Sequence, residues 1–409
     1  MGREGLMKSS AELFNRHIVQ SLVQDCRGVV GALAIALLLS ACAGTALDRD
    51  SIAALAPLKL GDNTLTVADA TARLPRPDLL ALDESMREFV EYYTRGQNNS
   101  RVRLLSLHQA IRGSGGLNME YDPFAEGTAQ EVFHRGTANC LSYANMFIAL
   151  AREAGLEANY QWLEVRPQWS KVSERVQVGL HVNVVVRLRD GKRFMVDIEP
   201  PPSRDIAGSQ ELTDSDAQAL YYNNIAMSAL ASENLEEAWT YLVSALQLSP
   251  EMAHLWVNLG AIYRYSGQHQ QAESSYLQAL ELDFTEYSAM TNLAVLYAIQ
   301  GREEERSFWL DKVERHRQSN PYYHAWRGDE AAAEKDWSAA LGHYSRAVEL
   351  LPRDSNLLFS RGLIHYQLNN YDAAATDIEF AIELATLYSD IAYYQLQLDE
   401  VHRARLAGT

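Results

Sequence analysis

Cysteine is scarce in this sequence, which has only three in 409 residues: Cys26, Cys42 and Cys140. None of them belongs to a Cys-x-x-Cys pair, and the chain has no His-Glu-x-x-His motif, so two common spacings of zinc ligands are missing. We therefore expect neither a bound metal nor a cofactor.

Basic residues are outnumbered by acidic ones. The chain has 36 Lys and Arg against 53 Asp and Glu, which gives a net charge of −17 at pH 7. Because binding to phosphate backbones requires a basic surface, nucleic acid is not an expected partner. Long apolar runs are also missing after residue 41, so no membrane-spanning helix is expected there.

The apolar run near the N-terminus has the form of a signal peptide. Basic residues precede this run at 29–39, which is too short to span a bilayer as an ordinary transmembrane helix. It ends in LSAC at 39–42, which resembles the bacterial lipobox. The resemblance implies cleavage after residue 41 and lipid on Cys42; an ordinary cleaved signal and an uncleaved anchor are the alternatives. Since no Asp follows Cys42, we expect an outer-membrane lipoprotein facing the periplasm of a bacterial envelope, with residues 1–41 as its signal peptide.

This interpretation leaves one thiol to explain. Cys26 would leave with the signal peptide and Cys42 would carry lipid, so Cys140 could form no internal disulfide. A lone thiol in an oxidising compartment is a liability unless it is buried or used.

The sequence after the lipobox divides into a tether and two domains. Residues 42–78 lack a sustained period and predict a tether with little structure of its own. Residues 79–208 predict an α+β domain, with helical patterns over 79–111 and 140–153 and alternating strands around 182–186 and 194–198. Three consecutive prolines at 200–202 are expected to close this domain.

A 34-residue period follows, and it is typical of tetratricopeptide repeats. About five copies fill residues 209–388, and residues 389–409 predict a capping helix with one polar and one apolar face. In the second copy, Gly260 and Tyr276 occupy the positions where a small residue lets paired helices approach and an aromatic residue fills the space between them. The third copy departs at Arg306 and Gln318, so its second helix is expected to pack differently.

Three residues of the first domain could carry chemistry. Cys140 opens a helix, where the positive end of the helix dipole favours the nucleophilic thiolate. His181 and Asp197 lie on the two predicted strands, and a cysteine nucleophile needs a base whose tautomer a carboxylate fixes. His134 is an alternative base that we expect at the surface, and Glu199 is the reserve acid. Taken singly, each of the three has an ordinary structural explanation: a small buried residue, a strand histidine or a strand-end cap.

The same stretch resembles a known family. The segments TAQEVF at 128–133, GTANCLSYA at 136–144 and AREAG at 151–155 are similar to the core of bacterial transglutaminase-like domains, and LHV and MVD supply its histidine and aspartate motifs. The resemblance implies an α+β papain-like fold with Cys140 as nucleophile, His181 as base and Asp197 as orienting acid. Many members have tryptophan two residues after the histidine, where this chain has Asn183.

Strand parity tests the triad independently. Asp190-Gly191 favours a two-residue hairpin, which would point His181 and Asp197 to opposite faces of the sheet. A loop of three or five residues centred on Arg189 would put them directly opposite each other on one face. It would also gather the apolar residues of both strands on the other face, and we therefore expect the odd loop.

Two functions are compatible with these features. The first is a membrane-anchored cysteine amidase, peptidase or acyl-transferase acting on a protein or peptide, with the repeats recruiting a protein partner. The second is a catalytically silent scaffold that organises an envelope protein complex through its repeats. The peptide groove of the repeats is expected to be lined by His254, Val257, Ala261, Arg264, Phe359 and Leu363.

Overall fold

The computed structural model describes residues 52–73, 77–165, 168–169, 176–177, 180–189, 191–201, 206–385 and 388–407. The predicted signal peptide at 1–41 and the predicted lipidation site at Cys42 lie outside these residues. Within the described part, no helix combines the length and the apolar character needed to cross a bilayer.

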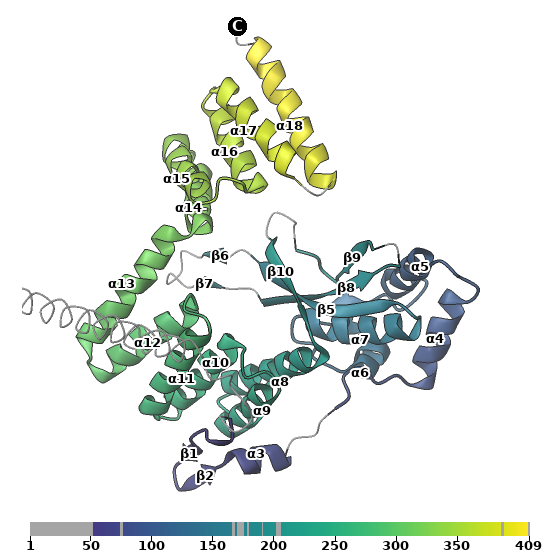
Figure 1. Ribbon diagram of the computed structural model, residues 1–409, viewed down its shortest axis with the longest axis vertical. Coiled ribbons are helices and arrows are strands. Elements are labelled where there is room, and N and C mark those ends of the chain that lie inside the picture. Colours follow the sequence, from purple (N-terminus) through teal and green to yellow (C-terminus); the bar gives the residue numbers. More distant parts are fainter. Residues whose placement is uncertain are drawn as a thin grey trace, which may run out of the picture. The chain divides into compact units, whose positions relative to one another are not determined.

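The first domain combines helices with an antiparallel sheet (Figure 1). Its helices are α4 (Glu84–Thr94), α5 (Ser100–Arg112), α6 (Ala129–Arg135) and α7 (Cys140–Glu153). Its sheet has the strand order β10-β5-β8-β9, from β5 (Glu157–Val165), β8 (Leu180–Arg187), β9 (Arg193–Val196) and β10 (Ile206–Leu212). Two further two-stranded sheets are formed by β3 (Glu120–Tyr121) with β4 (Thr137–Ala138) and by β6 (Gln168–Trp169) with β7 (Val176–Gln177).

Helix α7 is the centre of this domain. All eleven of its residues at 141–151 are buried, because the helix packs against β5 and β8 on one side and against α4 and α6 on the others. The face of the sheet turned to α7 contributes Val184 and Val186 to the core. Burial on all sides fixes the position of Cys140, the first residue of the helix.

The hairpin between β8 and β9 has the expected odd loop, but its centre differs from the prediction. Arg187 pairs with Arg193, so the loop has five residues, 188–192, and the register centres on residue 190 rather than on Arg189. Continuing the register places Asp197 opposite Asn183. His181 and Asp197 therefore share a face as diagonal rather than direct neighbours.

The sheet extends past the predicted domain end at residue 208. Strand β10 runs to Leu212 and pairs with β5, so the prolines at 200–202 do not close the domain. Thr213 then caps α8, its side chain accepting from the Asp216 N–H while the Asp216 carboxylate accepts in return. The change from sheet to repeat thus occurs within a single residue.

The expectation of a tether at 42–78 is wrong for residues 52–73, which we call the N-terminal segment. It forms a hairpin of β1 (Leu58–Leu60) and β2 (Asn63–Leu65), followed by α3 (Val67–Arg73). The segment is held to the repeats: Gln268 Nε2 donates to the Pro57 carbonyl at 3.1 Å, and Gln247 Nε2 donates to Thr71 Oγ1 at 2.9 Å. Ile52 and Leu58 are fully buried, so the contact is apolar as well as polar.

The repeats are stacked helix pairs. They comprise α8 (Asp214–Ala231) with α9 (Leu235–Leu248), α10 (Ala253–Tyr265) with α11 (His269–Leu282), α12 (Tyr287–Gln300) with α13 (Glu303–Ser319), α14 (Pro321–Ala333) with α15 (Trp337–Leu350), and α16 (Ser355–Gln367) with α17 (Tyr371–Leu384). A Cβ at Gly260 would lie 2.5 Å from the Tyr276 ring, and one at Gly328 would lie 2.6 Å from the Tyr344 ring. Glycine is therefore required where the paired helices approach.

The third pair differs from its neighbours. In α13 only Val313 is buried, although the helix has 17 residues. Arg306, at the position where alanine was expected, pairs with Glu303 at 2.9 Å on the helix surface. This helix therefore adds little to the core between repeats. After the fifth pair, α18 (Tyr388–Ala407) covers the end of the array and buries Tyr394, Leu398 and Val401.

Two of the six predicted groove residues are buried, and a third contacts the first domain. Val257 is buried, and Phe359 is stacked on Tyr394 of α18 with ring centroids 4.1 Å apart. The His254 ring lies 5.2 Å from that of Trp162 on β5. The groove prediction is therefore wrong for Val257 and Phe359, which are both buried, Phe359 beneath α18.

Candidate functional site

Cys140 is presented by the N-terminus of α7. Asn139 caps the helix, its Oδ1 accepting from the Ser142 N–H at 2.9 Å while its carbonyl accepts from the Tyr143 N–H at 2.9 Å. The N–H groups of Cys140 and Leu141 precede these bonded donors in the first turn. They point out of the helix end, where a developing negative charge is stabilised.

The fold brings the three residues predicted from the sequence together. Cys140 Sγ lies 3.6 Å from His181 Nδ1, and His181 Nε2 lies 2.5 Å from Asp197 Oδ2. The other oxygen, Asp197 Oδ1, accepts from the Glu199 N–H at 3.1 Å. The Asp197 side chain is only 2% exposed and that of His181 16%, whereas Cys140 is half-buried and reachable. Thiol, imidazole and carboxylate thus form a relay in the order that nucleophilic catalysis requires.

The electrostatics favour a charged imidazole. Burial of the ring opposes protonation, but the hydrogen bonds to Asp197 and Cys140 outweigh it and raise the pKa of His181 to about 10. An imidazolium beside the sulfur stabilises a thiolate. At neutral pH the imidazole beside the sulfur is therefore charged.

The same atoms could be considered as metal ligands, because they lie within 4.8 Å of one another. The histidine, however, uses its two ring nitrogens in different directions, Nδ1 toward sulfur and Nε2 toward the carboxylate. Both ring nitrogens are thus already engaged, one by the thiol and one by the carboxylate, which is the geometry of a hydrogen-bonded relay.

The alternative base and the reserve acid named from the sequence do not take part in the relay. His134 is half-exposed and pairs with Asp83 at 2.6 Å. Glu199 is exposed, and its backbone N–H supports Asp197. Asn183, which replaces the family's tryptophan, is 1% exposed, and neither its Oδ1 nor its Nδ2 has a hydrogen-bond partner among the described residues.

Tyr121 is a site residue that sequence analysis missed. Strand β3 runs parallel to β4, pairing Tyr121 with Ala138, and this places Tyr121 beside Cys140 at the wall of one cavity. Burial and the neighbouring Cys140 raise the pKa of Tyr121 to about 12, so its hydroxyl stays protonated at neutral pH. Nothing in the sequence signalled this contact, because β3 has only two residues.

Glu126 is the second missed residue. Its Oε1 accepts from Asn139 Nδ2 at 2.6 Å and from Asn224 Nδ2 at 2.8 Å, and its Oε2 accepts from Ser142 Oγ at 3.3 Å. Burial outweighs these bonds and raises its pKa. Since Asn224 belongs to α8, one carboxyl group joins the N-terminal cap of α7 to the first helix of the repeats.

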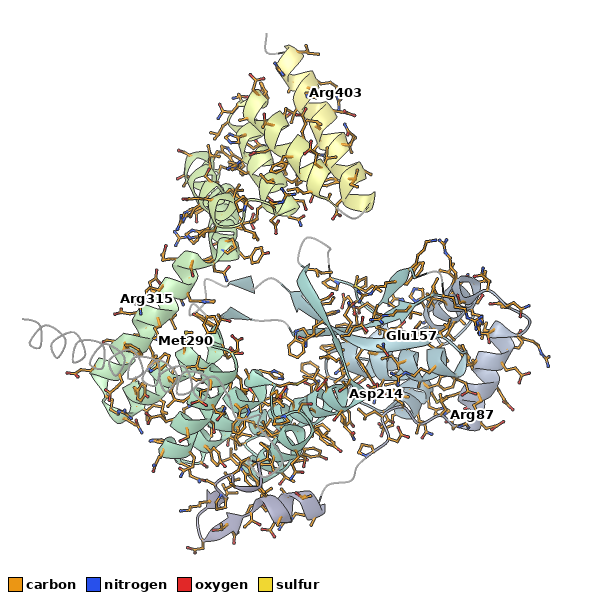
Figure 2. All side chains as sticks on the ribbon, in the orientation of Figure 1. Arg87, Glu157, Asp214, Met290, Arg315 and Arg403 are labelled. Carbon is orange, nitrogen blue, oxygen red and sulfur yellow. The ribbon has the colours of Figure 1, made fainter. Side chains whose placement is uncertain are left out.

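An ion pair reinforces the same connection. Arg152 near the end of α7 pairs with Asp214 in the first turn of α8 at 2.6 Å (Asp214 is labelled in Figure 2). Together with Glu126, it ties α8 to the nucleophile helix at two points.

Comparison with known families agrees with this architecture. Residues 87–198 match the transglutaminase-like superfamily, and residues 253–286 and 327–384 match tetratricopeptide repeats. The chain therefore contains a transglutaminase-like core domain followed by tetratricopeptide repeats, and the predicted fold class is confirmed.

Individual relatives are more distant. Anaphase-promoting complex subunit 3 of Schizosaccharomyces pombe is 22% identical over 179 residues, which is 38% of this chain and 27% of that protein. Photosystem I assembly protein Ycf3 of Synechococcus elongatus is 31% identical over 102 residues, 24% of this chain and 59% of that protein. The chain thus spans less than two thirds of the length of these relatives. Among solved structures, MamA from Desulfovibrio magneticus RS-1 is 17% identical with a TM-score of 0.24, covering 42% of this chain and 96% of its own.

Proposed function

We propose that this protein is a cysteine enzyme that attacks amide bonds of a protein or peptide substrate through Cys140. The relay of Cys140, His181 and Asp197 is the observation that carries this proposal. Its repeats recruit a protein partner, and lipid on Cys42 anchors it in a bacterial envelope, at the outer membrane facing the periplasm.

The chemistry follows from the geometry. The Cys140 thiolate attacks the amide carbon to form a carbon–sulfur bond, and the oxyanion is stabilised by the N–H groups at the start of α7. His181 Nδ1 donates its proton to the leaving amine, and an acyl-thioester remains on Cys140. Water or a second amine then attacks the thioester, His181 takes the proton of the nucleophile, and the thiolate leaves.

The first test is the rate at which iodoacetamide alkylates Cys140, followed by mass spectrometry of the peptide that contains it. At pH 6 an ordinary thiol, with a pKa of about 8.5, is almost entirely protonated and reacts slowly. We expect fast alkylation at pH 6 in the wild type and a loss of at least tenfold in His181→Ala. His134→Ala, which changes a surface histidine, is the matched control and should label like the wild type. Slow labelling in all three proteins would overturn the proposal and favour the silent scaffold.

The anchor is tested separately. Metabolic labelling with a radioactive fatty acid should mark the wild-type protein and leave Cys42→Ala unmarked. Equal labelling of the two proteins would overturn lipidation at Cys42 without affecting the proposed chemistry.

A further inference from the structure

A cavity of about 470 Å³ opens beside Cys140. This size falls within the range of about 300–1,000 Å³ usual for small-ligand pockets. One wall comes from the first domain. The other wall comes from α8, through Leu220, Asn224, Met227, Ser228 and Ala231.

The α8 wall is a continuous stripe of one helix. Its residues recur at steps of one, three and four positions, so they line a single face. All lie beyond residue 198, where the match to the transglutaminase-like family ends. The repeats therefore supply to this site a surface that the matched core domain does not contain.

The walls are mainly apolar. Pro123, Phe124 and Leu141 face the cavity from the first domain, and Leu220 and Met227 face it from α8. The Phe124 side chain is 90% exposed, which is unusual for an aromatic ring beside a reactive cysteine. A ligand that covered this ring would remove apolar surface from water.

The charge of the cavity restricts its ligand further. Among the described residues that line it there is neither lysine nor arginine, and the one carboxyl group among them, Glu126, already accepts from Asn139 and Asn224. An anionic group in the cavity would lie beside Glu126 with no lysine or arginine among the described lining residues, in a protein whose net charge is −17. The cavity therefore fits an uncharged, apolar group.

We propose that α8 of the repeats forms the side-chain pocket of the Cys140 site, and that this pocket accepts an uncharged apolar side chain of the peptide next to the amide that is attacked. The inference rests on the proposed role of Cys140. It makes Ser228 and Met227 residues that determine specificity, although they belong to a repeat.

The test compares three alkylating probes of different character on the full chain at pH 7. Iodoacetamide is small and neutral, N-benzyl iodoacetamide carries an apolar ring, and iodoacetate is anionic. In the wild type we expect N-benzyl iodoacetamide to label Cys140 on the order of tenfold faster than iodoacetamide, because the ring is buried in the pocket. Iodoacetate should be the slowest of the three.

A matched pair of variants locates the effect. Ser228 is exposed and lines the cavity, so Ser228→Trp should fill the pocket and bring the rates of the benzyl probe and iodoacetamide close to equality. Ser215 is exposed on the opposite face of the same helix, so Ser215→Trp should keep the preference. Met227→Ala, which widens the pocket, checks the wall with a substitution that adds no bulk and should lower the preference without abolishing labelling.

The outcomes separate the two proposals. Fast iodoacetamide labelling with no benzyl preference, or a preference that Ser228→Trp leaves intact, would overturn the pocket while Cys140 remained a nucleophile. Slow labelling by all probes, unaffected by His181→Ala, would overturn the proposed function itself.

Discussion

At the scale of single residues, the relay links folding stability to the charge of His181. Its pKa of about 10 in the folded chain exceeds the ordinary 6.5, so the folded state binds this proton more tightly than the unfolded state. The resulting stabilisation is complete below pH 6.5 and is lost as the pH rises toward 10.

This predicts a pH-dependent effect of Asp197→Asn. With Cys140→Ala in both proteins to remove the thiol, Asp197→Asn should lower the free energy of unfolding strongly at pH 6 and much less at pH 10. Urea unfolding at the two pH values measures the difference. An effect of equal size at both would mean that the carboxylate does not stabilise the imidazolium.

Asn183 provides a second prediction at this scale. Both polar groups of its buried amide lack partners in the described part of the chain, and leaving such groups unsatisfied costs about 1–3 kcal/mol. Asn183→Leu should therefore raise the free energy of unfolding. Asn145 is equally buried, but it donates to the Gly127 carbonyl at 3.0 Å and accepts from the Tyr160 hydroxyl at 2.7 Å, so Asn145→Leu should lower it. Destabilisation by both changes would show that Asn183 is satisfied by water.

The candidate site could be predicted from the sequence only in part. Cys140, His181 and Asp197 were predicted because each lies in a short sequence motif that indicates its chemical role. Tyr121 and Glu126 reach Cys140 and its cap through tertiary contacts, and neither has a neighbouring sequence signal. The odd hairpin loop was expected from the chemistry, but its centre depended on a pairing that parity alone does not determine.

At the scale of helices and strands, replacing glycine by alanine in the repeats should have opposite effects on stability at two positions. Gly260→Ala would place a methyl group 2.5 Å from the fully buried Tyr276 ring, which cannot move aside, and should cost about 1–3 kcal/mol. Gly342 lies in α15 with nothing within 4 Å of an added Cβ. Gly342→Ala should therefore stabilise by about 0.5–1 kcal/mol through helix propensity. Thermal unfolding of both variants measures these changes. A Gly260→Ala variant as stable as the wild type would contradict the close approach of the paired helices.

Elements with a strong period were predictable, and those without one were not. The 34-residue period predicted the helix pairs because each copy places small and apolar residues at the same positions, where its two helices pack. Strand β10 has the sequence IAGSQEL, which contains glycine and serine and lacks a clean alternation. It forms because the edge of β5 is available to it. The N-terminal segment likewise folds on the repeats, and its two strands of three residues each are too short to show a period.

At the scale of the whole molecule, the first domain and the repeats meet at a histidine. The His254 ring contacts Trp162 of the sheet, and burial lowers its pKa to about 4. The folded state therefore binds this proton more weakly than the unfolded state. Stability is complete above pH 6.5 and declines as the pH falls toward 4.

We accordingly predict that His254→Gln reduces the acid sensitivity of the protein. The urea midpoint of the wild type should fall between pH 7.5 and pH 5, and the variant should lose less over the same interval. His134→Gln, at the surface pair with Asp83, serves as the control that leaves this part of the sensitivity unchanged. If the variant kept the pH dependence of the wild type, His254 would be hydrated in the folded state and its protonation would not destabilise the fold.

The attachment of the N-terminal segment to the repeats bears on the reach of the proposed enzyme. With lipid at Cys42 as proposed, only nine residues, 43–51, separate the anchor from folded structure at Ile52, and their maximum span is about 30 Å. A chain tethered this closely would meet other molecules of the same membrane at a high effective concentration. The anchor would not raise the effective concentration of solutes in the bulk compartment. Under this proposal the short tether would select substrates by their distance from the bilayer, before any side chain reaches the cavity beside Cys140.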